Sequence, residues 1–501
     1  MVPDKTQYPS AFYNDSLALL TDLYQLTMAY GYWKNDLADQ EAVFHLFYRK
    51  PPFKGGYGIA AGLESVIDYV EQFHFSDSDI DYLKSLKGNN DKPIFEDAFL
   101  DYLADLKLEV DIDAIPEGTV TFPQEPLVRV KGSILQCQLL ETPLLNLINF
   151  PSLIATKASR VCRSAEGDPV LEFGLRRAQG IDGGLTVARA AYIGGCTGTS
   201  NVLAGKVFGI PVKGTHAHSW VMCFDDELES FKAYARAMPN NCVFLVDTYD
   251  SLEGVRNACR VGKWLRDEGY EMVGIRLDSG DLAYLSKKAR DILDEEGFPD
   301  AAIVASNDLD EHTIHSLKDQ DAKIALWGVG TRLATAHDDP AMGGVYKLSA
   351  VREPGSEWEY RLKLSEQRIK TTNPGILQVR RFCEERDDGN TEFIADMIYH
   401  LDHVPDKEST MIDPLDATRK KHFEADKKCE DLLKPIFEKG KLVYEKPSLD
   451  DIRDRASAQL ASFHEGVKRF SNPHEYPVGL EKQLNDMKTR LMEEAREEIE
   501  S

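Results

Sequence analysis

The central part of the chain repeats one pattern of apolar and polar positions. A short apolar run is followed by small or polar residues and then by a stretch with helical spacing. Such runs lie at residues 243–246, 272–275, 302–305, 324–327 and 345–348. The pattern predicts successive strand–helix units around a parallel sheet. A closed barrel and an open doubly wound sheet both fit it, and the barrel is modestly favoured.

The region before this repeat reads as mixed α/β. Apolar residues at helical spacing predict a helix over residues 16–33, and residues 43–48 predict a strand. Two further strands are predicted at 120–122 and 127–130, because a Pro-Gln-Glu-Pro stretch between them is typical of a tight connection.

The region after residue 350 is more charged. Strands are predicted at 360–364 and 393–398, and an acidic amphipathic helix near 478–499. We therefore expect an N-terminal α/β domain over 1–140, an α/β barrel catalytic domain over 141–350, and a C-terminal α+β segment over 351–501. Part of that last segment is able to pack back on the N-terminal domain.

Composition narrows the class of protein. Hydrophobic residues make up 42% and charged residues 29% of the 501 positions, which is typical of a globular chain. The formal net charge of −25 disfavours binding to nucleic acid and to anionic membranes. A phosphate-bearing substrate must then be held by a local cationic cluster or by helix N-termini, against the overall field.

The eight cysteines are scattered, and no CxxC spacing occurs. The sequence therefore signals neither a zinc site nor a thioredoxin-like motif and is typical of a reduced, intracellular protein. The apolar stretch at 17–23 is interrupted by Thr21 and Asp22, so no signal peptide is expected. We expect a cytoplasmic protein and leave nuclear presence open.

The densest chemical signal is Gly-Thr-His-Ala-His-Ser-Trp at residues 214–220. His216 and His218 would point the same way at the end of a strand. They could form a metal pair, they could supply a catalytic or phosphate-accepting histidine with a neighbour, or they could be two loop histidines. The other predicted strand ends offer Asp247 and Asp278 but no further histidine, which weakens the metal interpretation.

Two further motifs suit anions. Arg276 and Asp278 alternate to the same side of a strand end, where an arginine fork suits a carboxylate or phosphate and a carboxylate suits Mg²⁺ or a developing cation. A plain ion pair fits equally well. The Gly-Val-Gly-Thr stretch at 328–331 allows close backbone approach to a phosphate, although a simple strand–helix turn is the commoner reason for such glycines.

Arg176 and Arg177 form a basic pair that could grip an anion or begin a solvated helix. Tyr24, on the first predicted helix, is by itself most readily a packing residue. Together, arginines, a phosphate loop, carboxylates and a histidine suit a sugar pyrophosphate substrate. Loss of pyrophosphate from C1 of a ribose needs positioning and charge stabilisation more than a strong nucleophile.

The order and character of these motifs resemble the nicotinate phosphoribosyltransferase family. The matching stretches lie at residues 20–25, 172–180, 200–205, 214–220, 276–281, 306–308, 328–331, 343–348 and 476–478. The resemblance implies an irregular TIM-like α/β barrel with an N-terminal α/β domain and a C-terminal α+β extension. It also implies a homodimer with shared active sites.

The activity that the resemblance implies joins nicotinate to 5-phosphoribosyl 1-pyrophosphate. Nicotinate, the sugar pyrophosphate, ATP and water would give nicotinate mononucleotide, pyrophosphate, ADP and phosphate, as the first step of NAD salvage from nicotinate. ATP is then a co-substrate and Mg²⁺ the cofactor. Mg²⁺ would be held mainly by substrate phosphates, with Asp278 or Asp247 as candidate protein ligands.

The resemblance also assigns roles to single residues. It makes His218 the histidine that ATP phosphorylates and gives catalytic roles to Arg276 and Asp278. Nicotinate would contact Thr215, Arg276 and the ring of Tyr24, which in relatives often comes from the neighbouring subunit. The phosphates would be contacted by Arg176, Ser306, Asn307, Gly330 and Thr331.

Two positions depart from the family pattern. His216 stands where an apolar residue is expected, and Cys-Thr-Gly-Thr at 196–199 replaces a serine-rich stretch. Two other activities stay open at this point. One is nicotinamide phosphoribosyltransferase, which shares the layout, and the other is a metal-dependent hydrolase built on His216 and His218.

Overall fold

The computed structural model describes residues 16–365, 367, 370–405 and 408–500. The chain forms two compact units. Unit 1 contains the described residues within 16–152, 342–448 and 458–500, and unit 2 contains residues 153–341 and 449–457. The segments before and after the strand–helix repeat therefore belong to one unit.

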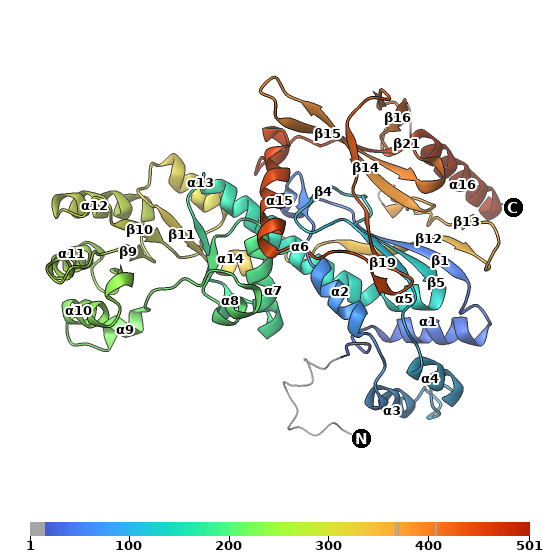
Figure 1. The fold of residues 1–501 in the computed structure, drawn as a ribbon, viewed down its shortest axis with the longest axis horizontal. Coiled ribbons are helices and arrows are strands. Elements are labelled where there is room, and N and C mark those ends of the chain that lie inside the picture. The colour runs from blue at the N-terminus through green and yellow to red at the C-terminus, as the bar shows by residue number, and fades with distance from the viewer. Residues whose placement is uncertain (1–15, 366, 368–369, 406–407, 501) are drawn as a thin grey trace. The chain divides into compact units, whose positions relative to one another are not determined.

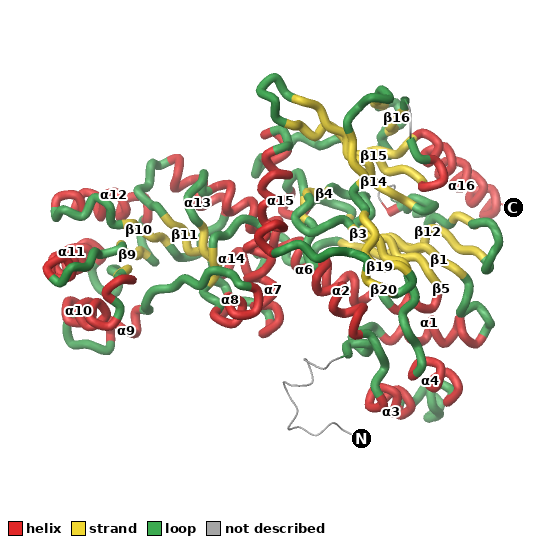
Figure 2. Tube along the Cα trace, viewed as in Figure 1, coloured by secondary structure: helices red, strands yellow, loops and turns green. Residues whose placement is uncertain are grey.

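Unit 2 is built on a parallel sheet with the strand order β7-β6-β11-β10-β9-β8. Its strands are β6 (Val170–Glu172), β7 (Gly198–Thr199), β8 (Val243–Leu245), β9 (Gly274–Leu277), β10 (Ala302–Ala305) and β11 (Leu326–Val329). Its helices are α7 (Gly180–Ile193), α8 (Val202–Phe208), α9 (His218–Met222), α10 (Glu227–Ala237), α11 (Ser251–Asp267), α12 (Leu282–Glu295), α13 (Glu311–Asp319) and α14 (Thr331–Ala334). Figures 1 and 2 show α10 to α13 lying around strands β9 to β11.

The structure confirms the expected α/β fold with a parallel sheet but not the irregular TIM-like barrel, because the described strands form no closed barrel. The strand order is that of a ring opened between β7 and β8, and no strand pairing joins these two within the described residues. The chain beyond β7 runs beside it through a single parallel bridge between Thr199 and Val212 and then leaves the sheet. Because β7 has only two residues, its edge offers too little backbone to continue the ladder to β8. Unit 2 is thus an open α/β sheet.

Aspartates cap the helices that follow the strands of this sheet. The side chains of Asp250, Asp281 and Asp310 accept hydrogen bonds from the backbone N–H groups of Glu253, Tyr284 and Thr313. Each satisfies a helix donor that would otherwise lack a partner and complements the helix dipole. Some of the aspartates that follow the strands therefore cap the next helix and do not face the edge of the sheet.

Unit 1 holds two larger sheets. One has the order β13-β12-β1-β5-β3-β19-β20, the other β17-β16-β21-β15-β14-β18, and β2 pairs with β4. The strands are β1 (Glu41–Tyr48), β2 (Gly58–Ile59), β3 (Asp111–Ala114), β4 (Val120–Thr121), β5 (Val128–Ser133), β12 (Gly344–Arg352), β13 (Glu359–Tyr360), β14 (Leu377–Glu385), β15 (Thr391–His400), β16 (Ser409–Ile412), β17 (Lys420–Phe423), β18 (Cys429–Asp431), β19 (Lys434–Glu438), β20 (Lys441–Leu442) and β21 (Val478–Glu481).

The remaining helices lie outside the repeat. They are α1 (Leu23–Lys34), α2 (Leu63–Gln72), α3 (Asp77–Ser85), α4 (Asp97–Ala104), α5 (Ile134–Leu139), α6 (Glu141–Ser164), α15 (Leu449–Ala461) and α16 (Lys482–Glu500), and the division between the units falls within α6 and α15. A core cluster in unit 1 includes Leu26 and Ala29 of α1 together with Phe99 and Leu103 of α4. Along the described chain, no helix combines the length and apolarity that crossing a bilayer requires.

Several predicted elements are placed differently. Residues 345–348, predicted as a barrel strand, lie in β12, which pairs antiparallel with β1 in unit 1. The strands predicted at 120–122 and 127–130 enter different sheets, because β4 pairs with β2 while β5 pairs with β1 and β3. The predicted N-terminal helix begins only at Leu23, and the predicted C-terminal helix is preceded by strand β21.

Candidate functional site

The carboxyl ends of the strands in unit 2 gather the predicted site residues along one edge of the sheet. Neighbouring strands in the order β6, β11, β10, β9 and β8 are all parallel. The residues at or after their carboxyl ends are Arg176, Gly330, Thr331, Ser306, Asn307, Arg276, Asp278, Asp247 and Thr248. In open α/β sheets this edge is where ligands bind.

Arg276 is held in one orientation by three side chains. Its Nε donates to Ser306 Oγ at 2.7 Å, and its Nη1 donates to Thr215 Oγ1 at 3.2 Å. Its Nη2 donates to Asp278 Oδ1 at 3.0 Å, and the Ser306 hydroxyl donates to the same carboxylate. The guanidinium is therefore a fixed fork rather than a mobile surface charge, which is the form that recognises carboxylates and phosphates.

The ring of Phe173 packs against the guanidinium of Arg276, and Gly328 leaves room for that ring. The Arg276 guanidinium carbon lies 5.7 Å from the centre of the Phe173 ring, within cation–π range. A Cβ at Gly328 would lie 2.7 Å from the same ring, so a side chain there would displace it. The glycine at this position thus makes room for the aromatic support of Arg276, in addition to any approach of a ligand to the turn that follows.

The side chain of Asp247 is almost fully buried, with 1% of it exposed. Its Oδ2 accepts from the backbone N–H of Asp278 at 2.8 Å and from Ser279 Oγ at 2.6 Å. Its Oδ1 is buried and has no hydrogen-bond partner in the described structure. A buried carboxylate oxygen without a donor is costly, so the site is built for a cation or a donor that a ligand supplies.

His218 begins helix α9 and faces this group. Its Nδ1 lies 3.1 Å from Thr248 Oγ1, and its Nε2 lies 4.0 Å from Asp247 Oδ1 and 3.8 Å from Asp278 Oδ2. The side chain is 39% exposed. His218 is therefore reachable from solvent while two carboxylates stand beside one ring nitrogen, an arrangement suited to proton or phosphoryl exchange.

His216 serves the fold instead. Its Nε2 accepts the backbone N–H of Leu245 at 3.2 Å, while its Nδ1 lies 3.4 Å from the carbonyl of Ala217. The ring packs against Tyr234, with ring centres 4.8 Å apart. The histidine thus satisfies a donor of β8 at the open edge of the sheet, where an apolar residue could not.

The two histidines do not form the metal pair of the hydrolase alternative. Residue 216 is buried against aromatic rings, and residue 218 points to the carboxylates, because the chain before α9 is a loop and not the strand end that the sequence predicted. Among the residues that the structure describes, no group of three or more His, Cys, Asp or Glu side chains could hold a metal ion.

His216 makes the stability of the protein sensitive to acid. Burial lowers the pKa of His216 from 6.5 to about 4. Between these values the unfolded chain binds a proton that the folded chain refuses, so stability present above pH 6.5 is lost as the pH falls. We expect this to account for about 2 to 3 kcal/mol of unfolding free energy between pH 7 and pH 4.5, measured by urea denaturation.

The variant His216→Gln keeps an acceptor for the Leu245 N–H but cannot titrate, so it should remove that part of the acid sensitivity. His315→Gln is the control, because His315 is about half exposed in α13. An unchanged pH dependence in His216→Gln would contradict the assignment.

Arg176, Gly330 and Thr331, three of the residues predicted to bind phosphate, follow β6 and β11 on the other half of the edge. Arg176 is the middle residue of the short 3₁₀ turn Leu175–Arg177 and is exposed. Gly174, before it, is so close to the next loop that a Cβ there would lie 3.0 Å from the carbonyl oxygen of Gly330. The turn of Arg176 and the turn of Gly330 and Thr331 therefore adjoin one another.

Asn307 carries backbone strain at this edge. Its φ is +119°, a value that favours glycine, and its side-chain oxygen accepts from the backbone N–H of Asp308 at 2.8 Å. Strained residues of this kind persist where the surrounding structure requires them, and they gather at functional sites. Asn307 follows β10 directly after Ser306, which contacts Arg276.

Glu172 and Thr199 are site residues to which sequence reasoning assigned no role. Burial raises the pKa of Glu172 above its ordinary value, and the carboxyl accepts from the Thr199 hydroxyl at 2.6 Å and from the backbone N–H of Gly174. The unusual stretch at 196–199 thus supplies the hydroxyl that ties β7 to β6. The sequence feature that could have identified Glu172 is its place as an acid within an apolar run, directly before Phe173.

Tyr24 lies in α1 of unit 1 and is 47% exposed. Its pKa is raised, first by burial and then by the nearby charges of Glu141 and Asp22. The contact with a pyridine ring that the resemblance implies for Tyr24 stays a prediction.

Comparison with known families and proteins covers nearly the whole chain. The N-terminal domain model of nicotinate phosphoribosyltransferase matches residues 19–149, the family model residues 169–359, and the C-terminal domain model residues 377–488. The nicotinate phosphoribosyltransferase of Bacillus subtilis (strain 168) is 45% identical, covering 97% of this chain and 99% of the relative. That of Dictyostelium discoideum is 40% identical, covering 93% of this chain and 87% of the relative.

The fold agrees with solved structures. The crystal structure of human nicotinic acid phosphoribosyltransferase superposes with a TM-score of 0.82 at 33% identity, covering 94% of this chain and 99% of that one. A nicotinate-nucleotide pyrophosphorylase from Pyrococcus furiosus shares the fold at 22% identity, with a TM-score of 0.66. Sequence and fold lead to one conclusion, that the chain belongs to the nicotinate phosphoribosyltransferase family.

Proposed function

We propose that this chain transfers the phosphoribosyl group of 5-phosphoribosyl 1-pyrophosphate to nicotinate and releases nicotinate mononucleotide and pyrophosphate. The observation that carries the proposal is the fixed fork of Arg276. It is locked by Thr215, Asp278 and Ser306 on the same edge as the Gly330–Thr331 turn. The names of the relatives support nicotinate as the acceptor.

The transfer itself exchanges one bond for another. The bond from C1 of the ribose to the pyrophosphate oxygen breaks, and its electron pair leaves with pyrophosphate. The ring nitrogen of nicotinate supplies the pair that forms the new C1–N bond, so no protein nucleophile is needed. Such a reaction is accelerated mainly by alignment of the two substrates and by charges placed where charge develops.

The residues of the edge can supply those charges. The carboxylates of Asp247 and Asp278 lie where they can stabilise the positive charge that builds on the ribose. The guanidinium of Arg276, which is partly exposed, can hold the carboxylate of nicotinate or a phosphate oxygen. The Gly330–Thr331 turn and Arg176 offer donors to the 5′-phosphate and the pyrophosphate.

Mg²⁺ fits this set of donors. The Oδ1 atom of Asp247 is buried and has no hydrogen-bond partner among the described residues, and Asp278 is partly exposed next to it. Mg²⁺ is usually held by one or two carboxylates together with substrate phosphates. Asp247 and Asp278 would hold it here, and when bound it neutralises charge on the leaving pyrophosphate.

We further propose that ATP phosphorylates a ring nitrogen of His218. The γ-phosphoryl group would pass to the imidazole with release of ADP, and water would later cleave the P–N bond to return histidine and phosphate. A phosphoryl group at this place adds about two negative charges beside Asp247, Asp278 and any bound Mg²⁺. The phosphorylated state would bind the substrates more tightly, and hydrolysis would release the product.

The variant His218→Ala should retain weak activity that ATP no longer stimulates. We expect wild-type stimulation on the order of tenfold or more, which is within the usual range of coupling between two sites, and none in the variant. Steady-state rates with and without ATP measure this, and His315→Ala serves as the control. Full ATP stimulation of His218→Ala would show that this histidine does not accept the phosphate.

One assay tests the function as a whole. Pyrophosphate release from 5-phosphoribosyl 1-pyrophosphate is followed with nicotinate, with nicotinamide or with neither, each with and without ATP. Release that requires nicotinate supports the proposal. Equal or faster release with nicotinamide would favour the nicotinamide enzyme instead, and no release with either base would make the chain a binding protein only.

The resemblance also implies a homodimer with shared active sites, and we propose this arrangement for the chain. The half exposure of the Tyr24 ring supports it, because that ring is available to a neighbouring subunit. Sedimentation equilibrium would measure the dimer. The cytoplasm remains the expected compartment.

A further inference from the structure

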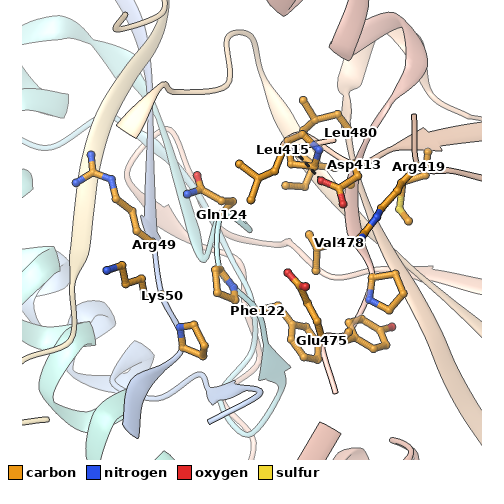
Figure 3. Close-up of a pocket in the computed structure, with 18 of the residues that line it drawn as sticks. Arg49, Lys50, Phe122, Gln124, Asp413, Leu415, Arg419, Glu475, Val478 and Leu480 are labelled. Carbon is orange, nitrogen blue, oxygen red and sulfur yellow. Dashed lines mark hydrogen bonds between the residues drawn. The ribbon is translucent and has the colours of Figure 1, made fainter. Parts of the chain in front are cut away.

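Unit 1 contains a cavity of about 860 Å³ that is lined by none of the residues assigned to phosphoribosyl transfer. The loops that follow β1 and β4 form one side of it. Strands β16, β17 and β21 and helix α16 form the other. Figure 3 shows Arg49 and Lys50 on one side of the cavity and Asp413 and Arg419 across from them. Its volume lies within the range of small-molecule sites.

The charge of the lining is opposite to that of the protein. Six cationic side chains stand against two carboxylates, those of Asp413 and Glu475, whereas the whole chain has a net charge of −25. The cationic residues are Arg49, Lys50, Arg419, Lys420, Lys421 and Lys488. A concave cationic surface inside an acidic molecule concentrates anions.

Lys488 is a cationic residue of the lining that is largely buried and has a neutral hydrogen-bond partner. Its Nζ donates to Asn373 Oδ1 at 2.8 Å, and no ion pair to Lys488 is present in the described part of the chain. Burial lowers the pKa of Lys488 to about 8. Because the partner is a neutral amide, the ammonium lacks a counter-charge that an anionic ligand would provide.

The rest of the lining is apolar. Met411, Val478 and Leu480 come from adjacent strands, and Leu415 is exposed on the turn after β16. The backbone N–H of Leu415 donates to Asp413 Oδ1 at 2.8 Å, which holds that turn at the rim (Figure 3). A small inorganic anion would leave this apolar wall uncovered. The lining fits a ligand that has an anionic group and also a sizeable apolar or ring-shaped body.

We propose that this cavity is a second ligand site and that it takes an organic phosphate of nucleotide size. The phosphate would lie near Lys488 and the cationic side chains, and the ring system would cover Met411, Leu415, Val478 and Leu480. The proposal goes beyond the transfer reaction. It is independent of the proposed function, because the residues that line the cavity include none of those assigned to phosphoribosyl transfer.

Isothermal titration of the full chain with AMP tests the proposal. We expect AMP to bind, and adenosine and ribose 5-phosphate, which carry only one of the two features, to bind at least about tenfold more weakly. The titration is repeated with saturating 5-phosphoribosyl 1-pyrophosphate, which should change the Kd of AMP by less than about twofold. No measurable AMP binding, or competition between the two compounds, would overturn the assignment.

Two variants locate the site. Lys488→Met removes the charge at similar length, and Leu415→Trp fills the cavity from an exposed turn without disturbing a buried position. Each should weaken AMP binding on the order of tenfold. Lys482→Met, on the exposed part of the same helix, is the matched control and should leave the Kd unchanged. Unaltered AMP affinity in both cavity variants, or its loss in Arg276→Ala, would place AMP elsewhere.

Discussion

Replacing Arg276 with lysine is expected to lower kcat/KM for nicotinate by about 10²- to 10³-fold. The charge remains, but an ammonium cannot contact Ser306, Thr215 and Asp278 at once in the plane of a fork. The remaining positive charge would be misplaced relative to both substrates. Steady-state kinetics with nicotinate and 5-phosphoribosyl 1-pyrophosphate varied separately would show which of the two the arginine orients.

Arg266→Lys is the matched control for this variant. Arg266 also forms a two-pronged pair, with Glu271 at 2.8 and 2.9 Å, but both side chains are exposed. Solvent screens an exposed pair, so activity and stability should hardly change. If Arg276→Lys kept more than about a third of the wild-type kcat/KM, the fixed fork would not be the feature on which transfer depends.

The second large effect concerns stability. Glu311, at the start of α13, is fully buried between two cations of α6, with Lys157 Nζ 2.7 Å from Oε2 and Arg160 Nε 2.8 Å from Oε1. Glu311→Ala removes the carboxylate that both buried cations contact, although Lys157 keeps its 2.7 Å contact with Asp338 Oδ2. The loss is expected to cost about 3 to 5 kcal/mol of unfolding free energy. Chemical denaturation monitored by circular dichroism measures this loss.

Glu271→Ala is the comparison for the buried acid, because it removes an exposed partner of Arg266 and should hardly change the unfolding free energy. Glu311 also lies close in sequence to the candidate site, because α13 follows Ser306 and Asn307, the two residues directly after β10. An equal effect of the two substitutions would mean that the buried group around α6 and α13 contributes no more than a surface pair.

The sequence predicted the part of the candidate site that consists of local motifs at strand ends. Arg276 lies in β9 and Asp278 directly follows it, so the alternation of side chains along a strand predicts their common direction. The same reasoning failed for His216 and His218, because the chain there is a loop that leads into α9. There, the direction of each ring depends on distant partners, Leu245 for one and Thr248 for the other.

Acidic residues illustrate the same limit. Asp247 and Asp250 are three residues apart, yet one faces the edge with an unpartnered oxygen and the other caps α11. Both are polar residues after an apolar run, and composition does not separate them. Only the path of the backbone decides whether the carboxylate meets its own helix or the neighbouring strand.

The sequence by itself determined the alternation of strands and helices, the excess of acidic residues and the motifs by which the family is recognised, because these depend on local spacing and residue type. Only the tertiary structure decided that the parallel sheet stays open between β7 and β8, and that residues 345–348 pair with β1 some 300 residues earlier. It alone brings Arg49 and Lys488 to one cavity. Strand partners and cavities arise from contacts between distant segments, about which the local pattern of burial carries no information.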